Sequence, residues 1–363
     1  MADISGLIAQ ANTDGRFAQI ANDPFTQFGT KARRYIGAEL MPEKTVESNM
    51  FQDEAFELLS TLANDESRHS PPTMQKIAKS AAMSVILGDS GLASQLNTPD
   101  FDALRRYLSR GQDMDALSRL LEFPEKFNTA LQEYNERQRW QMIVSSNVVR
   151  DGDNGYKETL AFDAPTGHRV NAGATWTGDA TVRDPFTDIL AGVDFLAGKG
   201  KTVSRIITGR SVSSILTLNS KMMSRTGVTV VNNIGAIGVS PARASQSGLS
   251  DAFGREGLPA PETYDLMWKK GATSGYFLPR NVVVLVAGTD NSTTVERNGQ
   301  AFNLEGTIGY TAIGPVAGFS APGRQIRVDF IDDIPPRVEG KSKQTSFPVL
   351  QDRESVYVIS AIT

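Results

Sequence analysis

One uninterrupted stretch of helix-forming residues constrains the fold of this chain most. Residues 124–149 open with Pro124, which suits a first helical position, and continue without another Pro or any Gly. The stretch of about 26 residues predicts a helix of ~39 Å, against a mean helix length of ~11–12 residues. Its apolar residues lie near one stripe and charged residues fill the rest: Phe127, Leu131, Tyr134 and Met142 against Glu133, Glu136, Arg137 and Arg139. We therefore predict a spine helix that lies across a sheet and not inside a core.

Composition excludes several classes of function. The 363 residues suffice for a sizeable core and predict two to three domains, or one domain with large excursions. The absence of Cys excludes disulfides, thiolate metal sites and thiol catalysis, and two His residues leave little for metal binding or acid–base work. The 41 acidic and 37 basic residues give a net charge of -4, which argues against a dedicated nucleic-acid binder. Any contact with DNA would be local and independent of base sequence.

The N-terminal segment carries no targeting pattern. It reads MADISGLIAQANTDGRF, without a basic head or an unbroken apolar run, so we expect no secretory signal. Nowhere do ~20 apolar residues run together, so we expect no membrane partner. Residues 1–45 hold scattered aromatic anchors that include Phe17, Phe25 and Phe28. Such a segment predicts either an arm that docks on a neighbouring subunit or an arm that packs on its own domain.

The order of the remaining elements predicts an α+β fold. Residues 46–97 read as a projecting hairpin or as two helices, and the turn-rich segment NDESRHSPPT favours the hairpin. Thr98 is predicted to cap a helix that ends at Gly111, and a second short helix from Asp113 is predicted to stop at Pro124. Helices are also predicted at 185–197, from Ser211 and at 240–253, with strands at 156–162, 203–208, 263–270 and 281–288. The closing strand, SVYVISAIT, is apolar on both faces, which predicts a place in the middle of a sheet close to the spine helix.

Three segments carry a resemblance to a known family. GATWTGDATVRDPFTDI at 173–189 places a tryptophan, then an Asp-Pro pair, then an acidic residue that opens a helix. GYFLPRNVVVLVAGT at 275–289 and SFPVLQDRESVYVISAIT at 346–363 follow at the expected distances. In this order the segments resemble the major head proteins of lambda-like tailed bacteriophages, the capsid protein E family. The family motif falls on Trp176, Asp184, Pro185 and Asp188.

The resemblance implies the Hong Kong 97 phage capsid fold. It divides the chain into an N-terminal arm at 1–45, an extended β-loop at 46–97, and a peripheral domain at 98–180 with the spine helix at 124–149. An axial domain at 181–320 and return strands to the peripheral domain at 321–363 complete it. The extended loop would reach over an adjacent subunit, so the resemblance implies subunit contacts near its tip and along the arm. We expect them at Arg68, His69, Lys76, Lys79, Phe17, Phe25 and Phe28, although a solvated turn accounts equally for each charged residue.

The function implied by the resemblance is structural. Many copies would form hexamers and pentamers of an icosahedral virion head, assembled in the host bacterial cytoplasm around double-stranded DNA. The implied partners are the chain itself, a scaffolding protein, a portal, a decoration protein and packaged DNA without sequence specificity. We expect no enzymatic activity, no cofactor, no metal and no covalent crosslinks between subunits. An encapsulin-like compartment shell and a phage maturation protease are the alternatives.

Four motifs suggest chemistry and have a simpler structural interpretation. GKGKT at 198–202 lacks the first glycine of a phosphate-binding loop, because Phe195 takes its place, so a helix cap and turn explain it better. GDSG at 88–91 would need a His base and an oxyanion-loop glycine for Ser90, so a turn is favoured. Asp332 and Asp333 lack the spaced ligands of a calcium loop, and His168 lacks a partner at metal-ligand spacing.

Overall fold

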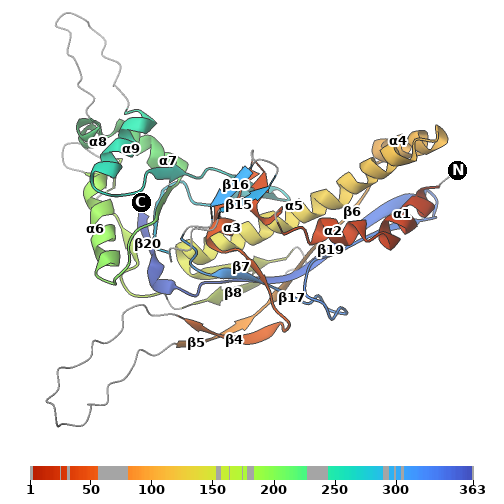
Figure 1. Cartoon of the computed structure of the whole chain (residues 1–363), viewed down its shortest axis with the longest axis horizontal. Coiled ribbons are helices and arrows are strands. Elements are labelled where there is room, and N and C mark those ends of the chain that lie inside the picture. The colour runs from red at the N-terminus through yellow and green to blue at the C-terminus, as the bar shows by residue number, and fades with distance from the viewer. Residues whose placement is uncertain are drawn as a thin grey trace, which may run out of the picture.

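The molecule is elongated and built along one helix. The computed structural model describes residues 3–24, 26–30, 33–55, 81–152, 157–162, 164–173, 175–177, 184–226, 244–288, 294–297, 300–303 and 306–361. The long helix α5 (Asp113–Ser145) joins two groups of elements, with α6 to α9 gathered at one end and α1 and α4 at the other (Figure 1). Among the described residues, no helix combines the length and the apolar character needed to cross a membrane.

The spine helix is longer at its start and shorter at its end than the sequence predicts. Helix α5 spans 33 residues and carries Pro124 in its interior, so the predicted separate helix before Pro124 is wrong. Leu117 and Leu120 before the proline share one cluster with Phe127 after it, and this packing outweighs the ~3 kcal/mol cost of an interior proline. The helix ends at Ser146, whose φ of 54° reverses the chain into strand β7 (Asn147–Asp151).

Helix α4 (Thr98–Ser109) precedes the spine, and its N-cap lies one residue earlier than the sequence predicts. Asn97, and not the predicted Thr98, is the N-cap, since its side chain accepts a hydrogen bond of 2.9 Å from the Asp100 amide. Thr98 itself has helical backbone geometry, so the capping position moves one residue upstream. Gly111 follows the helix at φ 70°, a conformation that favours glycine.

One five-stranded sheet lies under the N-terminal two-thirds of the spine. Its order is β18-β19-β17-β3, and β6 pairs with the other side of β19. The apolar stripe of α5 packs on it, together with helices α1 and α2 of the arm. The strands are β3 (Glu43–Thr45), β6 (Gly88–Gln95), β17 (Tyr310–Gly314), β18 (Gln325–Ile331) and β19 (Arg337–Val349).

A second five-stranded sheet, of order β11-β10-β14-β20-β9, lies at the other end of the spine. One face packs against the C-terminal part of α5, including Trp140 and Ile143, and the other against helices α6, α7 and α9. The strands are β9 (Arg169–Asn171), β10 (Arg205–Thr208), β11 (Pro261–Thr263), β14 (Val282–Val286) and β20 (Val356–Ser360). The helices are α6 (Pro185–Ala197), α7 (Arg210–Leu218), α8 (Ser220–Arg225) and α9 (Gln246–Arg255).

Strand β20 bears out the prediction for the end of the chain. It lies between β14 and β9. Val356 and Val358 belong to the core that contains Trp140, whereas Tyr357 and Ile359 belong to the core on the opposite face of the sheet. Strand pairs nevertheless cross the predicted domain ranges: β3 pairs with β17, β6 and β17 pair with β19, and β20 pairs with both β9 and β14. The division of the chain into five parts stays a prediction.

The arm folds back on the spine. Helices α1 (Ile4–Thr13) and α2 (Arg16–Ala21) pack on α5 and β18, and α3 (Ile36–Leu40) packs on α5 further along. Phe17 and Phe28 are 2% and 3% exposed, buried within the chain itself. These two positions therefore follow the alternative in which the arm packs on its own domain, and neither is open to a neighbour in this conformation. Phe25 lies outside the described residues.

Several strands form two-stranded ribbons outside both sheets. The predicted hairpin is confirmed at its base, where β4 (Met50–Ala55) pairs with β5 (Ala81–Ile86) in antiparallel register. The positions predicted for subunit contact near its tip, Arg68, His69, Lys76 and Lys79, lie outside the described residues. The other ribbons are β1 (Gly29–Thr30) with β2 (Arg33–Arg34), β7 with β8 (Lys157–Ala161), β12 (Met267–Lys270) with β13 (Thr273–Tyr276), and β15 (Thr294–Arg297) with β16 (Gln300–Asn303). Two short 3-10 turns, Thr26–Phe28 and Arg353–Ser355, complete the fold.

Candidate functional site

The most unusual feature of the interior is a set of buried charges on the spine, which we call the polar joint. It comprises Glu39, Glu43, Asn135, Glu136, Arg139, Tyr264, Arg324 and Gln344, drawn from the arm, the spine and both sheets. Apolar positions Leu117, Leu120, Phe127 and Leu131 lead along one stripe of α5, and Asn135, Glu136 and Arg139 continue the same stripe. Buried charges require compensating partners, so these contacts hold together the segments of the chain that supply them.

Glu136 is the centre of the joint. Its Oε1 accepts hydrogen bonds from the Gly37 amide at 2.8 Å, the Trp140 indole at 2.8 Å and the Tyr264 hydroxyl at 2.7 Å. Its Oε2 lies 3.4 Å from Nη1 of Arg139. One carboxylate, itself fully buried, therefore binds the arm, the spine and the segment after β11. A Cβ at Gly37 would lie 2.8 Å from Glu136 Oε2, so only glycine allows this approach.

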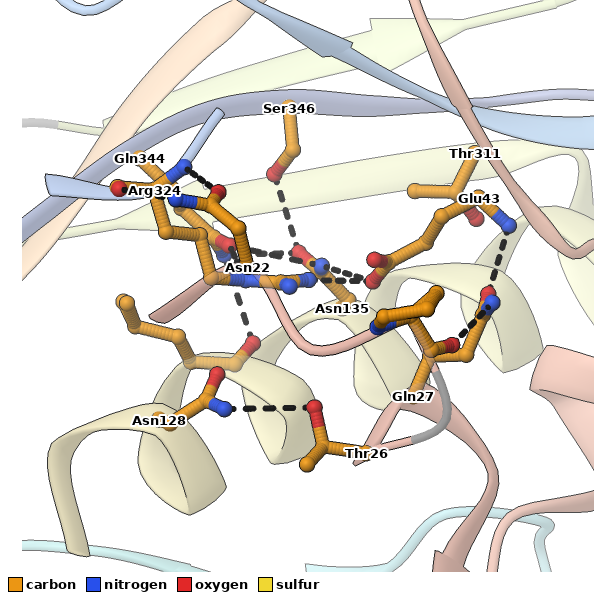
Figure 2. A network of polar contacts seen from close by, with 12 residues as sticks. Asn22, Thr26, Gln27, Glu43, Asn128, Asn135, Thr311, Arg324, Gln344 and Ser346 are labelled. Carbon is orange, nitrogen blue, oxygen red and sulfur yellow. Dashed lines mark hydrogen bonds and ion pairs between the residues drawn. The ribbon is translucent and has the colours of Figure 1, made fainter. Parts of the chain in front are cut away.

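Glu43 forms the second half of the joint. Its Oε1 accepts from Nη2 of Arg139 and Nδ2 of Asn135, at 3.4 and 3.3 Å, and is paired with Arg324 at the start of β18. Burial alone would raise the pKa of Glu43, but the Arg324 and Arg139 guanidinium groups outweigh it and hold the pKa below its ordinary value. Figure 2 shows Glu43, Asn135 and Arg324 converging between α5 and the first sheet.

Neutral side chains close the network around these charges. Asn135 Oδ1 accepts from Gln344 Nε2 at 2.8 Å and from the Ser346 hydroxyl at 2.9 Å, which ties the spine to β19 (Figure 2). Arg139 Nε donates to the Thr311 hydroxyl on β17 at 2.7 Å. With so many partners in place, the network specifies how α5 sits on the sheet as well as stabilising it.

A further part of the polar joint, around Glu39, ties the arm to the second sheet. Glu39, whose side chain is fully buried, contacts Arg34 at 2.5 Å and Arg205 of β10 at 3.0 Å. Glu262 of β11 contacts the same two arginines, each at 2.6 Å. Burial raises the pKa of Glu39 in spite of the Arg34 and Arg205 charges. The four side chains form a closed ring of ion pairs, so the arm is held to the second sheet.

The sequence does not predict this joint. Glu136 and Arg139 are fully buried, so their placement on an outer polar face is wrong. The helical periodicity could have indicated this burial. Both residues continue the stripe of α5 that is apolar further upstream, and this stripe stays buried along the helix.

The family-motif residues lie around the start of α6. Trp176 is buried and donates from its indole to Asp188 Oδ2 at 2.7 Å. Asp184 caps the helix by accepting from the Phe186 amide at 3.1 Å, and Pro185 is the first helical residue, as predicted. Burial would raise the pKa of Asp184, but its contact with Arg225 at 2.8 Å and the cap keep the pKa below its ordinary value. These residues orient α6 and its contact with α8.

The base of the β4–β5 hairpin carries exposed apolar side chains. Met50 and Ile86 at its root are 65% and 52% exposed. Arg150 of β7 donates to the Ile86 carbonyl at 3.3 Å, and the Leu87 amide donates to the Asn49 carbonyl at 3.0 Å. The root is therefore fixed to the body, while the ribbon pairs with no third strand among the described residues.

The motifs that suggested chemistry have structural roles. Gly198 ends α6, and Lys199 and Lys201 pair with Glu354 and Asp352, so the cap-and-turn interpretation of GKGKT is confirmed. Ser90 lies in strand β6, not in the predicted turn, and its buried Oγ has no hydrogen-bond partner among the described residues. Asp333 pairs with Arg337 at the end of β18. No group of three potential metal-binding side chains occurs in the described part of the chain.

His168 predicts a pH dependence of stability. Its Nδ1 lies 2.8 Å from the Val356 carbonyl and so carries the proton, whereas its buried Nε2 has no partner among the described residues. Burial lowers the pKa of His168 below 6.5. Below that pH the unfolded chain gains a proton that the folded chain resists, so this contribution to stability is present above pH ~6.5 and lost as pH falls.

We expect His168→Gln, which keeps a donor and cannot gain a charge, to flatten the fall in unfolding free energy between pH 7 and pH 5. Urea unfolding of the unassembled chain at several pH values measures this slope. The control is His69→Gln at the only other histidine in the sequence. Equal slopes for wild type and His168→Gln would contradict the assignment.

The chain is similar in structure to proteins of phage origin. A putative capsid protein of a prophage from Escherichia coli CFT073 matches with a TM-score of 0.60 at 14% identity, covering 97% of this chain and 99% of that one. A phage-related protein from Bordetella bronchiseptica RB50 matches with a TM-score of 0.51 at 15% identity, covering 92% and 94%. An encapsulin complex from Synechococcus elongatus PCC 7942 has a TM-score of 0.43 at 10% identity, covering 92% and 89%.

No family model matches the sequence, and no curated protein matches it significantly. The similarity therefore lies in the arrangement of elements and not in residue identity. It extends over nearly the full length of both phage-derived structures. The chain accordingly has the α+β phage capsid fold, the Hong Kong 97 fold that its sequence predicts.

Proposed function

We propose that this chain is the major capsid protein of a tailed double-stranded DNA bacteriophage. Copies would assemble into hexamers and pentamers of an icosahedral head that encloses the genome. The observation that carries the proposal is the match to a prophage capsid protein over 97% of this chain and 99% of the other.

The hairpin supports self-assembly on physical grounds. A two-stranded ribbon is marginal by itself in water and gains stability when a third strand or a packed face covers it. Val85 anchors the root of the β4–β5 ribbon in the core, but the ribbon has no third strand within the described chain, and Met50 and Ile86 beside this anchor are largely exposed. Shells need large interfaces built from projecting segments around rigid bodies, commonly above ~2,000 Å² for obligate contacts.

The polar joint supports the proposal that projecting segments surround a rigid body. It fixes the arm and both sheets on α5, so that a subunit would move as one body or rotate about defined contacts when a precursor shell expands. We propose the division into an arm at 1–45, an extended loop at 46–97, a peripheral domain at 98–180, an axial domain at 181–320 and return strands at 321–363. Strand pairs that cross these ranges, such as β17 with β19 and β20 with β14, link the parts within the proposed scheme.

The remaining partners belong to the same proposal. A scaffolding protein, a portal and a decoration protein would contact the shell, and packaged DNA would touch its inner face without sequence specificity. The location would be the virion, after assembly in the host bacterial cytoplasm. We propose no catalytic role, because the candidate nucleophile Ser90 has no base within hydrogen-bond distance among the described residues.

Electron microscopy of the purified, overexpressed chain tests the proposal, with and without co-expressed phage proteins. We expect closed polyhedral shells, tubes or ring-shaped capsomers. A species that remains monomeric even when a scaffold is supplied would overturn it. Shells that form without any phage protein and enclose a single cellular protein would favour the compartment-shell alternative instead.

A further inference from the structure

Strand β9 is a short edge strand with a basic side chain on each face of the second sheet. It spans three residues and pairs only with β20 among the described strands. His168, directly before it, is fully buried against α6, where its ring centroid lies 4.9 Å from that of Phe195. Arg169 points to the opposite face, toward the end of the spine. Short segments held at the edge of a fold can open while the rest stays folded.

Arg169 caps the carboxyl end of the spine without a carboxylate partner. Its Nε donates to the Val144 carbonyl at 2.9 Å, and its Nη2 donates to the Ile143 carbonyl at 3.1 Å. Nη2 also donates to the Ser146 hydroxyl at 2.5 Å. Burial lowers the pKa of Arg169, and no carboxylate in the described part of the chain offsets this effect. The negative end of the α5 dipole therefore compensates the charge in place of an acid.

His168 fastens the same strand to β20 in a form that has no place for a second proton. Its Nδ1 donates to a carbonyl of β20, and its own carbonyl accepts from the Val358 amide at 2.8 Å. Its buried Nε2 has no partner among the described residues. The charged groups that act on the ring are Lys199 after α6, Glu354 before β20 and the adjacent Arg169. Glu354 already pairs with Lys199 at 3.0 Å, so a protonated His168 would be a further buried cation beside Arg169.

We propose that β9 is a latch, a segment that detaches locally when His168 gains a proton. Detachment breaks the pairing of β9 with β20, lets the imidazolium reach water and withdraws Arg169 from the end of α5, while β10, β14 and β20 stay paired. Because the closed latch resists the proton and the open latch binds it, a fall in pH shifts the population toward the open form. The last turn of the spine is thus held to the second sheet at neutral pH and released in acid. This behaviour belongs to the single chain and does not depend on assembly.

Hydrogen exchange of the unassembled chain between pH 8 and pH 5, corrected for the intrinsic exchange rate, tests the latch by mass spectrometry. The reporters are the Val358 amide, which donates to His168, and the Ala172 amide, which donates to the Ser360 carbonyl. We expect exchange at the reporters to rise by up to about 30-fold relative to strand β14, the limit for a histidine that titrates near pH ~6.5 when open and stays neutral when closed. An equal rise in β14 would indicate global unfolding and overturn the latch, as would the absence of any rise.

The two histidine variants assign the effect to one side chain. His168→Gln cannot be protonated in this range, so its reporter exchange should not depend on pH, whatever its absolute level. His69→Gln, at the only other histidine of the sequence, is the matched control and should follow wild type. A pH dependence that persists in His168→Gln would contradict the proposal. Since every measurement uses the unassembled chain, such a failure would leave the proposed function standing.

Closing the latch with a disulfide gives a second readout, because the natural chain contains no Cys. Val170 and Ile359 lie opposite each other in the parallel pair of β9 and β20. In the oxidised chain that carries Val170→Cys and Ile359→Cys, we expect reporter exchange to lose its pH dependence although His168 is present. The reduced form of the same chain is the control and should keep that dependence. Equal pH dependence in both forms would show that His168 acts without detachment of β9, which overturns the latch.

Discussion

Replacing Glu136 by Gln is expected to lower the free energy of unfolding by about 3–5 kcal/mol, the usual effect of breaking a buried ion pair from one side. Glu136 is fully buried, and its Oε2 faces Arg139 at 3.4 Å. In the variant, either the new amide donor points at the Arg139 guanidinium or the three donors on Oε1 lose their acceptor. Arg139 would then rely on Glu43 alone for charge compensation.

Urea unfolding of the unassembled chain, followed by circular dichroism, measures the change. The matched control is Glu125→Gln on the same helix, where the side chain is exposed and the expected change lies within ~0.5 kcal/mol. A Glu136→Gln variant within about 1 kcal/mol of wild type would mean that the joint contributes little, contrary to its burial. Assembly of the same variant then reports whether the joint also sets the orientation of the domains.

Replacing Phe127 by Ala is expected to cost about 3–5 kcal/mol, as for other large apolar side chains removed from a core. Phe127 is 2% exposed and packs edge-to-face on Phe123, with ring centroids 4.9 Å apart. The ring also covers Gly340 of β19, where an added Cβ would lie 2.4 Å from Phe127 Cε2. The glycine thus marks a place where the spine packs closely on the sheet.

The double variant separates packing from other effects. Gly340→Ala alone is expected to cost about 1–3 kcal/mol because it overfills the contact. In the Phe127→Ala background the same methyl enters the new cavity, so its cost should vanish or change sign. Chemical denaturation of the four chains gives the coupling energy directly. Additive losses would show that the ring and the glycine do not share one contact.

Local signals account for the elements that the sequence predicts correctly. Helix α6 begins at Pro185 with Asp184 as its cap, because capping depends on groups within three residues. The hairpin base at β4 and β5 follows from alternating residues on either side of a turn-rich segment. Strand β20 is apolar on both faces, and this alone placed it inside a sheet.

Local signals failed where distant contacts decide. Pro124 reads as a helix start, yet the helix runs through it because residues on both sides pack on the same sheet. Thr98 reads as a cap, but the chain turns into the helix one residue earlier, at Asn97.

The sequence by itself determined the class of fold, the positions of most helices and strands, and the likeness to phage head proteins, because periodicity and capping are properties of neighbouring residues. Only the tertiary structure decided that Glu136 and Arg139 are buried, since a charge can leave water only where partners from distant segments meet it. Those partners, Gly37 and Tyr264, lie about 100 residues or more away in the chain and come together through the packing of α5 between two sheets.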